Sequence, residues 1–148
     1  METKQIQKSI GFLIAVILLI LSQSTRAQED TSRPLPPEKP ASLTLVRAIM
    51  CEGMKEFVPQ NETIIFSATL GEAVCFTAFD TVPEKTETYH NWFRKDRPDA
   101  KFKLTLKPPK WASFSKIRLR NSDTGPWRVE ITDANGKIFQ TLRFSVTE

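Results

Sequence analysis

The side chains that could hydrolyse a substrate are sparse in this chain. Its single histidine, His90, could act as a general base for a serine, with a carboxylate orienting the imidazole. The candidates for these two roles are Ser113, Ser115, Asp96 and Asp99. No nucleophile elbow, Gly-rich loop or pair of carboxylates flanked by apolar residues accompanies them. We therefore interpret His90 as a histidine at the rim of the core, bonded to the backbone, and expect a protein that is not an enzyme.

Cations dominate the second half of the sequence, and one stretch of it contains no acid. Residues 101–107 and 113–120 each alternate between apolar and polar side chains, the pattern of a strand with one buried face. If the two strands are neighbours, their outward cations form one basic surface that would attract phosphate, anionic lipid or acidic glycan. These cations are Lys101, Lys103, Lys107, Lys110, Lys116, Arg118 and Arg120.

An aromatic side chain lies within this basic stretch. Trp111 follows two prolines and a lysine, so we expect it in a loop. A flat ring beside several cations suits a sugar that bears acidic groups, because the ring can stack while the charges pair. The alternatives are that the cations only solvate a face and protect an edge strand, and that Trp111 only covers the core. The predicted ligand site consists of Lys110, Trp111, Lys116, Arg118 and Arg120.

The two cysteines, Cys51 and Cys75, both fall in predicted strands. A disulfide between them would close a loop of about 24 residues and contribute roughly 3 kcal/mol, and an exported protein can form one. We expect this disulfide; the alternative is two buried thiols. A metal site is not expected, because zinc takes three or four ligands and the chain has one histidine. No cofactor is expected either.

The start of the chain has the features of a secretory signal peptide. Lys4 and Lys8 precede an apolar run over residues 10–21, which is shorter than the roughly 20 residues that cross a bilayer. Small side chains at Thr25 and Ala27 predict cleavage after Ala27. Residues 1–27 are then the signal peptide, and the mature protein is periplasmic or secreted. An uncleaved segment that anchors the protein in the inner membrane is the alternative.

The mature chain divides into a tether and one domain. Residues 28–41 hold four prolines among polar residues, so they cannot form a core and favour an extended linker. Residues 42–148 contain several short runs with β-branched and aromatic residues, separated by prolines and turn residues. Trp92 and Trp127 alternate with polar neighbours, so we expect both in the core. This pattern predicts an all-β, immunoglobulin-like antiparallel sandwich of about seven strands, in which residues 54–61 form a loop or one helical turn.

Six short motifs occur in a characteristic order: Cys-Glu-Gly, Cys-Phe-Thr, His-x-Trp, Trp before Ser-x-Ser-Lys, Gly-x-Trp-x-Val and Asp-x-x-Gly. They begin at Cys51, Cys75, His90, Trp111, Gly125 and Asp133. Over about residues 45–146 the chain resembles an uncharacterised bacterial family of exported or membrane-anchored sandwich domains, domain of unknown function 2914. The resemblance implies a bacterial source and a small all-β module carried beside membrane or envelope segments, and it implies no activity. The family usually has Trp-Tyr-Tyr after the histidine, where this chain has Trp-Phe-Arg.

These observations favour a binding protein over other classes. We expect an exported, non-catalytic module of the bacterial envelope that recognises an anionic ligand, a glycan or a lipid, through a basic sheet face. The second hypothesis is a structural or assembly module that docks an envelope protein through a sheet edge. The net charge of +4 for the whole chain is too small to indicate nucleic-acid binding. Once the signal peptide is cleaved, the protein would not span a membrane.

Overall fold

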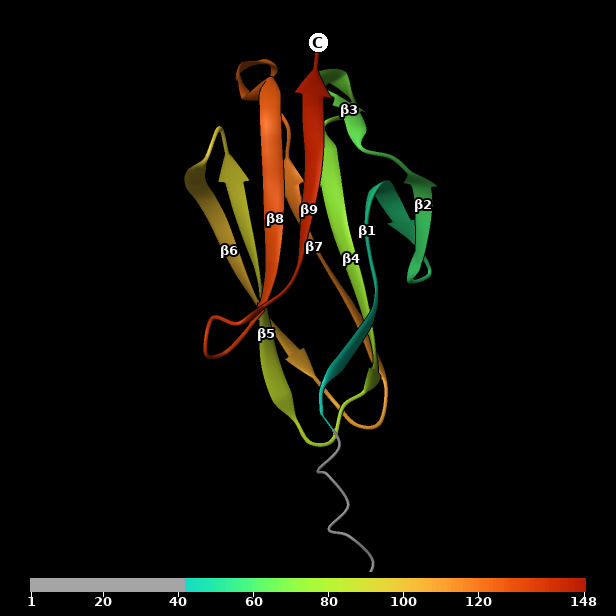
Figure 1. Ribbon diagram of the computed structural model, residues 1–148. Helices are drawn as coiled ribbons and strands as arrows, with labels where there is room; N and C mark the ends of the chain where they lie inside the picture. The colour runs from blue at the N-terminus through green and yellow to red at the C-terminus, as the bar shows by residue number, and fades with distance from the viewer. Residues whose placement is uncertain (1–41) are drawn as a thin grey trace, which may run out of the picture. The chain divides into compact units, whose positions relative to one another are not determined.

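The structure of the protein is a computed structural model that describes residues 42–148 (Figure 1). The predicted signal peptide at residues 1–27 and the predicted tether at residues 28–41 lie outside the described residues, so both stay predictions. In the described part of the chain, no helix has the length and apolar character needed to cross a membrane.

Nine β-strands and two short 3-10 turns make up the regular structure of residues 42–148. Side-chain alternation explains most of them, because a residue pattern of period two buries one face of a strand. The strands are β1 (Thr44–Lys55), β2 (Val58–Glu62), β3 (Ile65–Ser67), β4 (Glu72–Thr81), β5 (Thr86–Arg94), β6 (Arg97–Leu106), β7 (Trp111–Arg118), β8 (Gly125–Asp133) and β9 (Ile138–Thr147). The turns are η1 (Ala68–Leu70) and η2 (Asn121–Asp123).

The strands form two sheets, in the orders β2-β1-β4-β7 and β3-β9-β8-β5-β6. The predicted all-β sandwich is therefore confirmed. The strands are nine rather than about seven, and β3 pairs in parallel with β9, so the sandwich is not wholly antiparallel. The β5–β6 hairpin, η1, η2 and the C-terminus share one end of the sandwich, and the β4–β5, β6–β7 and β8–β9 connections lie towards the other (Figure 1).

The prediction for residues 54–61 was wrong. This segment completes β1 and forms most of the antiparallel strand β2, joined by a tight turn at Glu56 and Phe57. Both turn residues have positive φ, 49° and 62°. Such turns usually carry glycine or asparagine, so this hairpin lacks the local signal by which hairpins are recognised.

The core lies between the two sheets and contains both tryptophans that were predicted to be buried. Trp92 of β5 is fully buried, and Trp127 of β8 is 4% exposed. Phe144 of β9 joins them, since its ring packs edge-on against Trp92 and stacks on Trp127 with a centroid separation of 5.9 Å in each case. These aromatic contacts fix the second sheet, on which the candidate site is built.

The predicted disulfide is absent: Cys51 and Cys75 are both free, buried thiols. They lie on the neighbouring strands β1 and β4, where Cys51 pairs with Val74 and Cys75 pairs with Met50. Successive side chains on a strand point to opposite faces, so this register turns the two sulfurs away from each other. Cys75 packs in the core, whereas Cys51 lies on the outer face of its sheet. Burial raises the pKa of both thiols.

Candidate functional site

The predicted ligand residues all lie on or beside β7, but acids of the neighbouring strand β4 reach two of them. The Nζ of Lys110 lies 2.5 Å from a carboxylate oxygen of Asp80, and that of Lys116 lies 3.0 Å from one of Glu72. The antiparallel pairing of β4 with β7 brings these acids in from about 30–44 residues away. Although this stretch contains no acid in the sequence, the fold places acids beside it. These acids reduce the positive electrostatic potential at Lys110 and Lys116.

Trp111 does not share a site with the arginines that were grouped with it. It lies opposite Phe79 and packs partly against the core, and Lys107 places its Nζ 5.4 Å from the ring centroid. Trp111 begins β7 and Arg118 ends it. At roughly 3.3 Å per residue, seven steps along a strand separate them by about 23 Å. One sugar ring therefore cannot stack on Trp111 and also pair with Arg118 or Arg120.

The two basic strands are not neighbours, so they do not form one basic surface. Lys101 and Lys103 lie on β6 at the edge of the five-stranded sheet, whereas β7 is at the edge of the other sheet. Both lysines also have local partners. Lys101 lies 4.5 Å from the ring centroid of Tyr89, and Lys103 pairs with Glu87 at 2.6 Å. This hydrogen-bonded pair lowers the pKa of Glu87 and raises that of Lys103.

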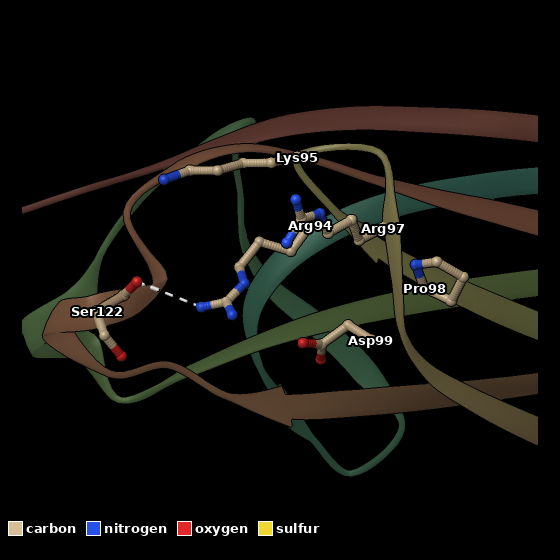
Figure 2. Close-up of a pocket in the computed structure, with 6 residues that line it drawn as sticks. All are labelled: Arg94, Lys95, Arg97, Pro98, Asp99 and Ser122. Atoms are coloured by element: carbon tan, nitrogen blue, oxygen red, sulfur yellow. Dashed lines mark hydrogen bonds between the residues drawn. The ribbon is translucent and has the colours of Figure 1, made fainter.

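The structure forms a different basic site at the end of the sandwich that holds the β5–β6 hairpin. There the hairpin and the η2 turn enclose an open hollow of about 480 Å³, which we call the basic hollow. Three cations and one acid project around it (Figure 2). The lining residues are Arg94, Lys95, Arg97, Pro98, Asp99 and Ser122.

A tight turn brings the three cations of the basic hollow together. Lys95 and Asp96 occupy the turn with φ values of 46° and 63°, and Arg94 and Arg97 face each other as the closing pair of the hairpin. This left-handed geometry matches the twist of an antiparallel pair and permits a loop of two residues. Four consecutive residues thus place three positive charges at one end of the sheet.

Gly125 at the start of β8 holds the hairpin turn in place. Its φ of 119° is a conformation that glycine adopts without strain, and a Cβ there would meet the Cε of Lys95 at 2.8 Å. The stem of Lys95 therefore lies across a surface without a side chain. The Lys95 amide also donates a hydrogen bond to the carbonyl of Pro126, at 2.9 Å. These contacts set the position from which the Lys95 ammonium extends.

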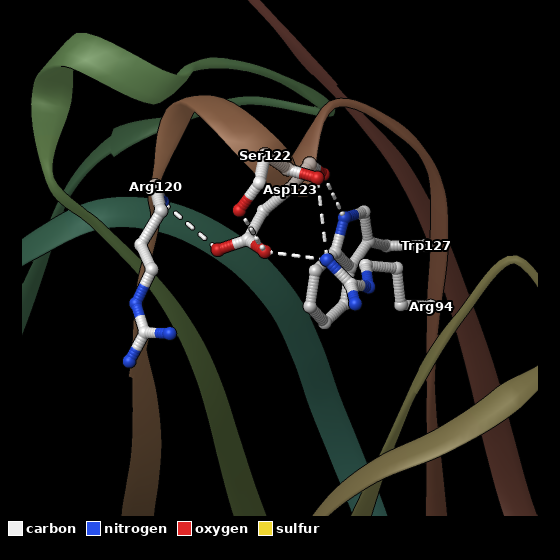
Figure 3. A network of polar contacts seen from close by, with 5 residues as sticks. All are labelled: Arg94, Arg120, Ser122, Asp123 and Trp127. Carbon is white, nitrogen blue, oxygen red and sulfur yellow. Dashed lines mark hydrogen bonds and ion pairs between the residues drawn. The ribbon is translucent and has the colours of Figure 1, made fainter.

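Asp123 of η2 connects the η2 turn, β8 and the basic hollow (Figure 3). One carboxylate oxygen accepts from Arg94 at 2.6 Å, and the other accepts from the backbone amide of Arg120 at 2.9 Å. The Asp123 carbonyl accepts from the indole N–H of Trp127 at 2.7 Å. The Asp123 side chain is 13% exposed and that of Arg94 is 37% exposed, so this ion pair is partly shielded from solvent. These hydrogen bonds use Nη1 of Arg94 and fix the position of its guanidinium group. The other N–H groups of Arg94 remain beside the basic hollow.

His90 is not at the rim of the core, and its partners are side chains rather than backbone. It is fully buried, with Nδ1 2.8 Å from the hydroxyl of Ser115 and Nε2 3.2 Å from that of Thr77. The indole N–H of Trp92 donates to the same Ser115 oxygen at 3.0 Å. Desolvation lowers the pKa of His90 to about 4. The histidine thus meets one predicted serine, but in a buried network that ties the two sheets together and contains no carboxylate.

The structure separates the remaining residues that were predicted as site residues. Of the hydrolase candidates, Asp96 pairs with Arg128 and Asp99 lines the basic hollow, so neither carboxylate hydrogen-bonds His90. Arg118 ends β7 and Arg120 directly precedes η2, so these two exposed arginines lie at the end of the sandwich that holds the basic hollow. Sequence reasoning missed the residues of the hollow, although the run Arg-Lys-Asp-Arg between two strands was a usable signal. Within residues 42–148 no group of three metal-binding side chains gathers.

Comparisons with known proteins place part of the chain in a family. Residues 85–146 match the family described as "Protein of unknown function (DUF2914)", so this part of the chain is a DUF2914 domain. The match is shorter than the predicted resemblance over about residues 45–146 and leaves out the motifs at Cys51 and Cys75. The matched residues include β5 to β8, all of β9 except its last residue, and every residue of the basic hollow. No curated protein sequence matches the chain.

A comparison with solved structures found the β-D-glucoside glucohydrolase of Trichoderma reesei, with 14% sequence identity and a TM-score of 0.35. The similarity covers 72% of this chain and 19% of the enzyme. This chain therefore corresponds to about a fifth of that enzyme's length. A similarity of this size carries no information on activity.

Proposed function

We propose that this protein, whose residues 85–146 are a DUF2914 domain, is a non-catalytic binding module that recognises an anionic ligand through its basic end. The observation that carries the proposal is the basic hollow, where Arg94, Lys95 and Arg97 surround an open space. Cations grouped around a concave surface attract anions more strongly than the same charges spread over a face, because the low-dielectric walls focus their field.

The charge balance of the basic hollow supports this proposal. Asp123 offsets the charge of Arg94, and Asp99 adds one acid to the lining. Among the described residues Lys95 and Arg97 form no ion pair, and the three cations still outnumber these two acids. Arg118 and Arg120, two of the residues predicted from the sequence, add positive charge beside η2. Lys110 and Trp111 lie at the far end of β7 and are not part of this site.

The proposed ligand is part of the bacterial envelope, such as an acidic glycan or an anionic lipid. This location rests on the signal-peptide pattern of residues 1–27, and the mass of the native protein tests it by giving an N-terminus at or near Gln28. We also propose an immunoglobulin-like topology. The orders β1-β4-β7 and β9-β8-β5-β6 correspond to strands A-B-E and G-F-C-C′ of that fold, with Trp92 at the position of its buried strand-C tryptophan.

Retention on immobilised heparin, an acidic glycan, tests the proposed function. The variant Lys95→Ser/Arg97→Ser should elute at clearly lower salt than the parent, because exposed ion pairs weaken as salt shortens the Debye length. The control Lys85→Ser/Lys137→Ser removes the same charge from the opposite end and should elute close to the parent. Equal losses for the two variants would show only a response to net charge and would refute a site at the basic hollow.

Docking of an envelope protein through a sheet edge is the second candidate function. The observation that favours it is β6, a ten-residue strand at the edge of its sheet. An edge strand offers unpaired backbone groups to which an extended segment of a partner can add. Binding of this kind relies on backbone hydrogen bonds and would persist at high salt, which distinguishes it from anion binding.

A further inference from the structure

We infer that the basic hollow binds a phosphate ester that also carries a primary ammonium group, as in an ethanolamine phosphate. The inference rests on the proposed function and adds the chemical class of the ligand. Its starting point is the one acid among the lining residues, Asp99 of β6.

Asp99 divides the basic hollow into a positive and a negative side. Its carboxylate points into the hollow and lies on the opposite side of Arg94 from Lys95 (Figure 2). Within residues 42–148 Asp99 forms no ion pair, although three cations line the same space. A purely anionic ligand can bind the three cations, but it leaves this carboxylate without a partner. A ligand with one anionic and one cationic group satisfies both sides.

The cations of the basic hollow suit a phosphate. Lys95 is a compact charge on a flexible stem, and Arg97 presents a planar fork that can donate two parallel hydrogen bonds to phosphate oxygens. Arg94 uses Nη1 for Asp123 and Ser122, so its remaining N–H groups are free to contribute. A phosphodiester carries a single negative charge, which these donors can match while Asp99 balances a second, positive group.

Asp99 favours a primary ammonium over a quaternary one. The ammonium of an ethanolamine has N–H groups that donate charge-assisted hydrogen bonds to a carboxylate, whereas choline has none. A volume of about 480 Å³ is sufficient for such a head group, since small-molecule sites span roughly 300–1,000 Å³. Because the basic hollow is open, the phosphate can remain esterified to a glycerol or a sugar outside it.

Isothermal titration of the purified protein with three soluble probes tests the inference. Glycerophosphoethanolamine should bind roughly tenfold more tightly than glycerophosphocholine, a phosphodiester of the same charge, which is the size expected for one charge-assisted hydrogen bond. Glycerol 3-phosphate, which carries no ammonium, tests phosphate binding alone. The variant Asp99→Asn should lose this preference and still bind glycerol 3-phosphate. The control Glu84→Gln, in the exposed β4–β5 loop, should keep it. Unchanged melting temperatures are expected, because both acids are exposed.

The outcomes separate this inference from the proposed function. Phosphate probes that bind without a preference for ethanolamine, or a preference that survives Asp99→Asn, would overturn the inference alone. Failure of all three probes to bind would overturn both. Cosedimentation with vesicles of phosphatidylethanolamine, but not of phosphatidylcholine, would support the inference and identify a lipid source. Preferential binding of the soluble ethanolamine probe without cosedimentation would support it with a glycan as the source.

Discussion

Two groups of polar residues in this protein have distinct tasks. Asp123 has both carboxylate oxygens occupied, so it holds Arg94 in a fixed position beside the basic hollow. His90 and Ser115 instead lie between the sheets, where each polar atom needs a partner because burial without one costs about 1–3 kcal/mol. The first arrangement orients a cation at the proposed binding site, and the second specifies how the two sheets pack.

The buried histidine makes stability depend on pH. His90 has a pKa of about 4 when folded and about 6.5 when unfolded, so below pH 6.5 the unfolded chain binds a proton that the native protein does not. The contribution to stability is complete above pH 6.5, and about 3 kcal/mol of it is lost as the pH falls to 4. Urea unfolding at a series of pH values measures this loss.

Nuclear magnetic resonance gives a direct check, because the chain has one histidine and its imidazole signals are unambiguous. These signals should not shift between pH 7 and pH 5.5 in the native protein. An imidazole that titrates near pH 6.5 would show that His90 is accessible to water and would contradict the buried network.

At the scale of strands and turns, Gly125 is the residue whose replacement is most informative. Its φ of 119° strains any other residue, whereas Gly53 of β1 has ordinary φ and nothing within 4 Å of an added Cβ. Gly125→Ala should therefore destabilise the protein by about 1–3 kcal/mol. Gly53→Ala, the matched control, should be neutral or slightly stabilising, because glycine is unfavourable within a strand.

Thermal unfolding of the two variants measures this difference in stability. Because Gly125 supports the stem of Lys95, its replacement should also weaken heparin retention, and Gly53→Ala should leave retention unchanged. Equal melting temperatures for both variants would mean that the positive φ at Gly125 has no structural role.

The sequence predicted strands well and the relations between strands poorly. Alternation identified β8 and the buried Trp92 and Trp127, because burial of one face is a local property. The disulfide prediction failed since the faces of Cys51 and Cys75 depend on the register of β1 against β4, which no local pattern reveals. The prediction of a single basic surface failed for a related reason. Whether β6 and β7 belong to the same sheet depends on the topology of the whole domain, which no local pattern reveals.

The basic hollow was missed on similar physical grounds. Arg94, Lys95 and Arg97 were visible as a charged run, but the run gains meaning only when Ser122 and Asp123 of η2 are placed beside it. Conversely, Lys110 and Lys116 looked promising because their acidic partners are remote in the sequence. Sequence spacing locates charges along one strand, and it does not reveal their cross-strand partners.

For the molecule as a whole, the two ends of the sandwich have different characters. One end combines the basic hollow with Arg118, Arg120 and the C-terminus, and the described chain begins towards the other (Figure 1). At the far end, Lys110 is paired with Asp80. The basic hollow therefore lies at the end of the sandwich opposite the start of the described chain.

Amide chemical-shift mapping tests the central claim most directly. Glycerol 3-phosphate titrated into the isotope-labelled protein at low salt should shift the amides of Arg94, Lys95, Arg97 and Ser122, and added salt should reverse the shifts. The amides around Lys110 and Trp111 should stay in place. Shifts centred on Lys110 and Trp111, or none at either end, would contradict the account that the basic hollow is the binding site.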